Sequence, residues 1–314
     1  MQMLGKYKTT LWLSVVLVLL LLLVPQLGSK YLVDLTTEIM IYALFALSLN
    51  VLIGYSGNIS FGHAAYFAIG GYACAIFLTT YELPLIISMP GAIILAGLAA
   101  AFVGYFCIKL TDIYFAMLTL AFGMLVWAVA FKWRSVTGGD DGFVGVSVPE
   151  FIGNRYAFFY FTLTVVTISS GLLWLICHSA FGRTLVAVRE NRMRASFVGV
   201  DTKRLRHTAF VVAGTFAGVA GALFAMYNRG VYVESAFWTE SGQVLIMTLL
   251  GGLYSFFGPA LGAAVLYTLQ VSINQYTEYW PIVLGTILLV ILMFLPDGLV
   301  GLAQKIGAQF SRRT

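Results

Sequence analysis

The sequence predicts an all-α membrane protein of about ten transmembrane helices, some of them broken, in one integral domain over residues 1–314. Three observations support this. Hydrophobic residues make up 60% of the chain and charged residues only 10%, whereas soluble domains carry about 25% charged residues. Several apolar runs approach or exceed the roughly 20 residues that cross a bilayer as a helix. The basic residues also gather on alternate connections between these runs, as the positive-inside rule requires.

The expected helices are the apolar runs between breaks made by glycine, proline or charge. The first begins after Lys6 and Lys8 and resembles a signal peptide, but PQLGSKY follows it without a small-x-small cleavage pattern, so we expect an uncleaved span. The expected ranges are 10–27, 32–53, 61–80, 84–109, 113–131, 157–179, 208–228, 241–253, 258–272 and 279–302.

The segment from Ser241 to Gln270 could form one long helix or two short ones broken at Gly251, Gly252, Gly258 and Pro259. Charge decides between them. Ten spans with a cytoplasmic N-terminus put thirteen of the eighteen bases and four of the thirteen acids in the cytoplasm, whereas nine spans would put the basic C-terminal tail outside. The broken helix and two cytoplasmic termini are therefore predicted.

A basic loop over residues 182–207 joins the sixth and seventh predicted helices. It holds seven bases against two acids, and the bases are Arg183, Arg189, Arg192, Arg194, Lys203, Arg204 and Arg206. The positive-inside rule alone explains part of this charge. The loop also predicts a short amphipathic helix, which starts at Thr184, carries Leu185, Val188, Met193 and Phe197 as apolar residues, and stops at Gly199. Such a helix suits a cytosolic partner.

Four stretches together resemble a known family. They are GRTLVAVREN with the helix AFVVAGTFAGVAGALFA, GYSGNISFGHAAYFAIGGYACA, TGGDDGFVGV and LLGGLYSFFGPALGAAV. They resemble LivM-like permease subunits of ABC importers of the branched-chain amino acid type, which lie in the bacterial inner membrane. The resemblance implies a related second permease, two ATPases that use ATP, and an extracytoplasmic binding protein, which would contact the outward loop around TGGDDG. This chain has no GxxxxGK[ST] motif, so we expect it to bind no ATP and no other cofactor.

In that family the cytoplasmic loop contains a coupling helix that docks in a cleft of the ATPase. The resemblance implies that apolar residues fill the cleft while arginines meet acids at its rim. The residues expected to couple this chain to an ATPase are Arg183, Leu185, Val188, Arg189, Glu190, Arg192, Met193 and Gly199.

Glycine and small residues between Gly54 and Ala65 predict a broken helix that restarts near Ser60. A broken helix within the membrane exposes backbone amides to a substrate, so Ser60, Gly62 and His63 are candidates for lining the pathway. Gly258 is a further candidate, because Phe257-Gly258 repeats Phe61-Gly62. The alternative is that these small residues serve close helix packing.

The predicted helix 209–225 carries a small-residue ridge, which favours close packing within the chain or with a partner permease. The ridge residues are Ala213, Gly214, Ala217, Gly218 and Gly221. The sequence shows no catalytic triad spacing and no metal-binding cluster, so we expect no catalytic or metal site. Lipid is an expected partner and nucleic acid is not.

The substrate is open at this stage. Branched-chain amino acids are favoured by the resemblance, while relatives of this kind also transport urea, short amides and other small acids. The rival function is a self-sufficient secondary transporter or channel, in which the basic loop only fixes topology. Such a protein needs ionisable residues within the membrane, and the predicted spans contain almost none.

Overall fold

The computed structural model describes residues 18–276, together with residues 279, 282–283, 285–286, 289 and 298–301. Eight helices there correspond to predicted spans: α2 (Lys30–Asn50), α3 (His63–Thr79), α4 (Leu85–Cys107), α5 (Asp112–Lys132), α7 (Arg155–His178), α10 (Thr202–Tyr227), α11 (Trp238–Gly251) and α12 (Gly258–Asn274). The first predicted span is described only from residue 18, where residues 18–23 are helical. Most of the last, 279–302, lies outside the described residues.

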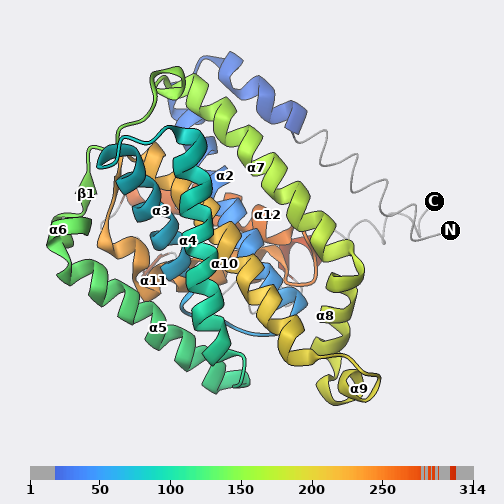
Figure 1. Cartoon of the computed structure of the whole chain (residues 1–314). Coiled ribbons are helices and arrows are strands. Elements are labelled where there is room, and N and C mark those ends of the chain that lie inside the picture. Colours follow the sequence, from blue (N-terminus) through green and yellow to red (C-terminus); the bar gives the residue numbers. More distant parts are fainter. Residues whose placement is uncertain are drawn as a thin grey trace, which may run out of the picture.

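Short elements connect these helices (Figure 1). They are α6 (Arg134–Thr137), α8 (Ala180–Glu190), α9 (Arg192–Phe197), the strands β1 (Phe143–Val144) and β2 (Gly230–Val231), a π-helical turn (Val51–Tyr55), and 3-10 turns at Val24–Leu27, Gly139–Asp141, Glu150–Ile152 and Val233–Ala236. The two strands pair antiparallel, with Phe143 opposite Val231. In Figure 1, α8 and α9 project from the lower end of the bundle.

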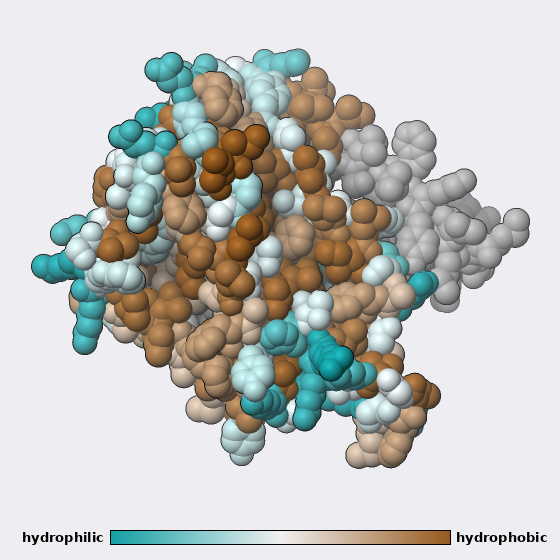
Figure 2. Space-filling model, viewed as in Figure 1, coloured by the Kyte–Doolittle hydropathy of each residue, from teal (hydrophilic) through white to brown (hydrophobic). Residues whose placement is uncertain are grey.

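Five described segments are long and apolar enough to cross a membrane. They are Lys30–Tyr55, Leu85–Cys107, Asp112–Lys132, Arg155–His178 and Thr202–Tyr227. Figure 2 shows hydrophobic side chains over the middle of one face and hydrophilic ones mainly toward its margins. The chain is therefore an all-α, multi-pass membrane protein.

The core forms where α10 packs against α2, α3 and α4. The small-residue ridge of α10 is buried. A Cβ atom at Gly218 would overlap the Cβ of Ala96, and one at Gly221 would overlap the carbonyl oxygen of Phe67. The predicted ridge of Ala213, Gly214, Ala217, Gly218 and Gly221 is thus confirmed as a packing seam, and its neighbours lie in the same chain.

The segment after α10 forms two short helices. Gly252 follows α11 with a φ of +114°, which favours glycine. A Cβ atom at Gly251 would overlap the carbonyl oxygen of Gly258, so the backbones of α11 and α12 meet closely. The predicted break is therefore confirmed.

Contacts between connections divide the helix ends into two groups. At one end, Arg155 forms an ion pair with Asp34 at 2.8 Å, and β1 pairs with β2. At the other end, Arg206 on the first turns of α10 donates to the carbonyl oxygen of Ile108, after α4. The second group includes α8 and α9, so the basic loop lies at the opposite end from Asp34 and Arg155.

Candidate functional site

A non-helical segment separates α2 and its π-helical turn from α3. The π-helical turn ends at Tyr55, and residues 56–62 are not helical. Gly57 has a φ of +72°, and a Cβ atom there would lie 2.7 Å from Cγ of Arg189. Glycine is required at this position both for the backbone conformation and for the close approach of the arginine. The predicted broken helix is confirmed, although α3 begins at His63 and not near Ser60.

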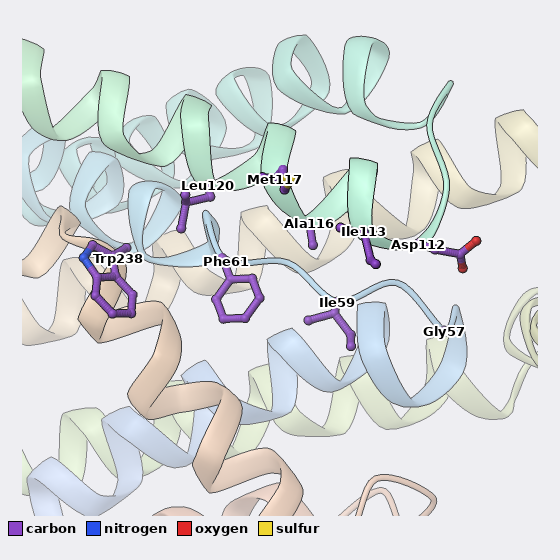
Figure 3. A pocket seen from close by; sticks show the side chains of 9 residues that line it. All are labelled: Gly57, Ile59, Phe61, Asp112, Ile113, Ala116, Met117, Leu120 and Trp238. Carbon is purple, nitrogen blue, oxygen red and sulfur yellow. The ribbon is translucent and has the colours of Figure 1, made fainter.

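A cavity of about 510 Å³ lies between this segment and α5. Figure 3 shows its lining: Gly57, Ile59, Phe61, Asp112, Ile113, Ala116, Met117, Leu120 and Trp238. The Asp112 carboxylate lies near one end and the Trp238 ring at the other. The cavity opens at the surface, because the side chains of Ile113 and Met117 are 72% and 64% exposed. It is an apolar pocket with an acid near one end.

The predicted pathway residues lie behind this pocket, inside the chain. Ser60 and His63 are fully buried, and His63 Nε2 lies 2.8 Å from the Ser48 hydroxyl oxygen. A Cβ atom at Gly62 would overlap the carbonyl oxygen of Thr119. In this structure these residues contact neighbouring helices, and their lining of a substrate pathway stays a prediction.

The start of α3 and Gly258 also make contacts within the chain. The backbone amide of Ala64, in the first turn of α3, donates to the Ser241 hydroxyl at 2.9 Å, so it is not free for a substrate. Gly258 is buried, and a Cβ atom there would overlap the carbonyl oxygen of Gly252. Its glycine serves the close contact between α11 and α12.

Sequence reasoning missed the residues that do line the pocket, although a signal was available. Side chains alternate between the two sides of an extended segment, so Ile59 and Phe61 face the pocket while Ser60 faces the core. On α5, Ile113, Ala116 and Leu120 recur at helical spacing and share one face. Trp238 begins α11, far along the chain, and only the fold brings it here.

The basic loop forms two helices where one was predicted. α8 begins at Ala180 and ends at Glu190, so Thr184 lies within the helix and does not cap it. Asn191 is extended, and its side chain accepts a hydrogen bond of 2.9 Å from the Arg194 amide, which caps α9. Gly199 follows α9 with a φ of +87°, so the predicted stop is confirmed.

Burial corrects the apolar face of the predicted coupling helix. Leu185 and Val188 are 1% and 0% exposed and pack within this chain. They cannot fill the groove of a partner in this structure. The exposed apolar side chains of the loop are instead Met193, Phe197 and Val198, at 69%, 83% and 81% exposed.

The charged residues of the loop divide into outer and inner ones. Arg183 and Glu190 are exposed, and Glu190 forms an ion pair of 2.7 Å with Arg189. Arg189 also donates to the carbonyl oxygen of Gly54 and lies over the Tyr254 ring. Arg192 and Arg206 both donate to Asn58. Several bases of the loop thus contact the broken helix beside the pocket.

The chain matches a family model over residues 31–293, and the model describes the permease component of the branched-chain amino acid transport system. The chain belongs to this family. The permease is 29% identical to the high-affinity branched-chain amino acid transport system permease protein LivM of Escherichia coli, with 89% of this chain and 72% of that protein covered. It is 24% identical to LivH of the same organism, with 83% and 91% covered.

Two further comparisons each cover 83% of this chain. The permease is 27% identical to a probable LivM protein of Methanocaldococcus jannaschii, over 83% of this chain and 90% of that protein. A solved structure, PsaBC from Streptococcus pneumoniae in complex with Fab, aligns over 83% of the permease and 91% of that chain at 15% identity and a TM-score of 0.44. At that level the structural comparison adds nothing to the family assignment.

Proposed function

We propose that this permease forms one half of the translocation pathway of an ATP-driven importer of branched-chain amino acids in the bacterial inner membrane. The observation that carries the proposal is the apolar pocket between residues 57–61 and α5. It opens on a face of α5 where Ile113 and Met117 are exposed among the residues that the structure describes. A second permease could complete the pathway there.

The pocket suits an amino acid with an aliphatic side chain. Ile59, Met117 and Leu120 offer an apolar surface to such a side chain. Transfer of an aliphatic side chain from water to this surface lowers the free energy of the system. The Asp112 carboxylate would attract the ammonium group of the same molecule. The names of the relatives, which specify branched-chain amino acid transport, support this substrate class over urea, amides or other small acids.

The proposed topology has ten spans with both termini in the cytoplasm. The eight described helices account for the middle of the chain, and the predicted spans 10–27 and 279–302 would add one at each end. α11, of 14 residues, is shorter than the roughly 17 residues that the shortest spanning helices need, which suits a broken helix within the membrane, while α3 and α12 reach that length with 17 residues each.

The proposed second permease is a related chain. This permease is similar to both LivM and LivH of Escherichia coli, whose names assign them to one high-affinity transport system. Two related chains facing each other across a shared pathway would each contribute an α5 face. An extracytoplasmic binding protein would contact the connection that carries Asp140 and Asp141, where exposed carboxylates could steer docking.

The proposed engine is a pair of ATPases that dock on α8 and α9. An isolated α9, only six residues long, gains little from its own hydrogen bonds. Together with Val198, which follows it, α9 nevertheless exposes three large apolar side chains, the other two being Met193 and Phe197. Such exposed apolar clusters mark interaction sites. An apolar cleft in an ATPase would bury them, while exposed bases such as Arg183 meet acids at its rim.

The function is tested by co-purification and transport. The tagged permease should bring with it a second polytopic permease and a P-loop ATPase, identified by mass spectrometry. Proteoliposomes of this complex, given its binding protein, should take up L-leucine only with ATP. Uptake driven by an ion gradient by the permease alone would overturn the proposal in favour of a secondary transporter.

Filling the pocket should block transport. In Ala116→Phe a phenyl ring enters the pocket, so L-leucine uptake is expected to fall by about tenfold or more, since a substrate must fit the space that the ring occupies. Ala121→Phe is the matched control, because Ala121 lies exposed on the same helix and does not line the pocket. Equal uptake by the two variants would remove the pocket from the pathway.

A further inference from the structure

Three arginines from the basic loop and the start of α10 converge on the break between α2 and α3. Arg189 donates to the Gly54 carbonyl oxygen. Arg192 Nη2 and Arg206 Nη2 both donate to Asn58 Oδ1, at 3.1 and 2.7 Å. Residues more than 130 positions apart in the chain therefore meet at one short turn.

Asn58 is the shared acceptor at the centre of this cluster. Its side chain is buried, and its Nδ2 donates to the Ser56 hydroxyl at 2.5 Å. Two guanidinium groups therefore bind its oxygen while its nitrogen is bound by the turn itself. Hydrogen bonds to charged donors are stronger than neutral ones, so the orientation of this amide is fixed by α9 and α10 together.

Arg206 extends the cluster to α4 and α5. It is 4% exposed and donates to the carbonyl oxygens of Ile108 and Leu110, at 3.3 and 3.2 Å. Among the residues that the structure describes, no carboxylate forms an ion pair with it. A buried charge without a direct ion pair depends on its hydrogen-bond acceptors, so displacement of Asn58 or of the 108–110 connection would be costly.

The cluster adjoins both walls of the pocket. Asn58 lies between Gly57 and Ile59, which line one wall. Leu110 lies two residues before Asp112, which begins α5 and the opposite wall. Asn58, which two arginines contact, is adjacent to lining residues of one wall, and Leu110, which Arg206 contacts, is separated from the other wall by a single residue. A displacement of α9 or of the start of α10 would therefore move both.

We propose that Asn58, Arg192 and Arg206 form the junction that transmits movement of α8 and α9 to the walls of the pocket. The inference rests on the proposed function, since it assigns these residues to the coupling of ATP hydrolysis with transport. They act as positioning residues: Arg192 links the junction to α9, Arg206 links it to α10, and Asn58 links both to the pocket. Directional hydrogen bonds suit this task, because apolar contacts alone would let the elements slide.

Arg192→Gln and Arg194→Gln form the matched pair that tests the junction. Both remove one positive charge from α9, but only Arg192 contacts Asn58, while the Arg194 side chain is exposed. In proteoliposomes of the full complex, leucine taken up per ATP hydrolysed should fall about tenfold in Arg192→Gln relative to Arg194→Gln, as expected for the loss of a charge-assisted hydrogen bond. Arg192→Lys should restore most of it.

Asn58→Leu provides the second variant, since leucine has a similar volume but accepts no hydrogen bond. Because Arg206 loses an acceptor, the complex should assemble in lower yield, but the complex that assembles should keep ATP hydrolysis while taking up less leucine. An uptake-to-hydrolysis ratio equal to that of the Arg194→Gln complex in both variants would overturn the junction. A parallel fall of assembly, hydrolysis and uptake would also overturn it, by assigning the cluster a structural role. If the unaltered complex takes up no leucine, the proposed function itself fails, and the two failures are thereby distinguished.

Discussion

Phe197→Asp is expected to abolish ATP-driven uptake while the permease remains in the membrane. The phenyl ring is 83% exposed, so the chain loses little packing when it is replaced. If α9 docks in an apolar cleft, however, the substitution removes a large apolar contact and places a charge without a partner there. We expect the amount of ATPase that co-purifies with the permease to fall by about a hundredfold, corresponding to roughly 3 kcal/mol of binding free energy.

Phe197→Leu is the control for this experiment, because it keeps an apolar side chain at the same position. It should retain most of the ATPase and most of the uptake. Membrane insertion of both variants is checked by the yield of monodisperse protein in detergent. Normal co-purification of the ATPase with Phe197→Asp would exclude α9 as the docking element.

Gly221→Leu is expected to prevent folding, because even a Cβ atom at Gly221 would overlap the carbonyl oxygen of Phe67. Backbone atoms of α3 cannot move aside as a flexible side chain can. The smaller change Gly221→Ala should lower the free energy of unfolding by about 1–3 kcal/mol, as overpacking does. The measurement is thermal unfolding of the detergent-solubilised permease, followed by size-exclusion chromatography after heating.

Gly171 provides the matched control on α7. A Cβ atom there meets nothing within 4 Å, so Gly171→Ala should raise the stability by about 0.5–1 kcal/mol through the higher helix propensity of alanine. The same substitution is thus expected to have opposite signs at two helical glycines. Equal midpoints for the two alanine variants would contradict the packing seam between α10 and α3.

Apolar runs and charge placement were sufficient to predict the eight long helices that correspond to spans and the break between α11 and α12, but not α6 or the division of the basic loop into α8 and α9. The small residues on one ridge of α10 predicted a packing seam, and the structure confirms it within the chain. The physical reason is that span length, hydrophobicity and close helix packing depend mainly on local sequence. The family assignment rests on a match that extends over residues 31–293.

The pathway residues were harder to predict, because a small residue at a broken helix serves packing as readily as a substrate. Gly57 and Phe61 line the pocket while Gly62 packs against Thr119, and the composition of the segment does not separate these roles. The sequence suggested Leu185 and Val188 as contacts for a partner because they are apolar in a basic loop. Only the fold reveals that other parts of this chain bury them.

The sequence by itself determined the class of protein, the order of its helices and its family. The tertiary structure decided which side chains face outward and which distant residues meet. Asn58 and Arg206 are 148 positions apart, and nothing near either residue in the sequence specifies their hydrogen bond. Such contacts depend on how α10 packs against the other helices, which is a property of the whole bundle and not of any one segment.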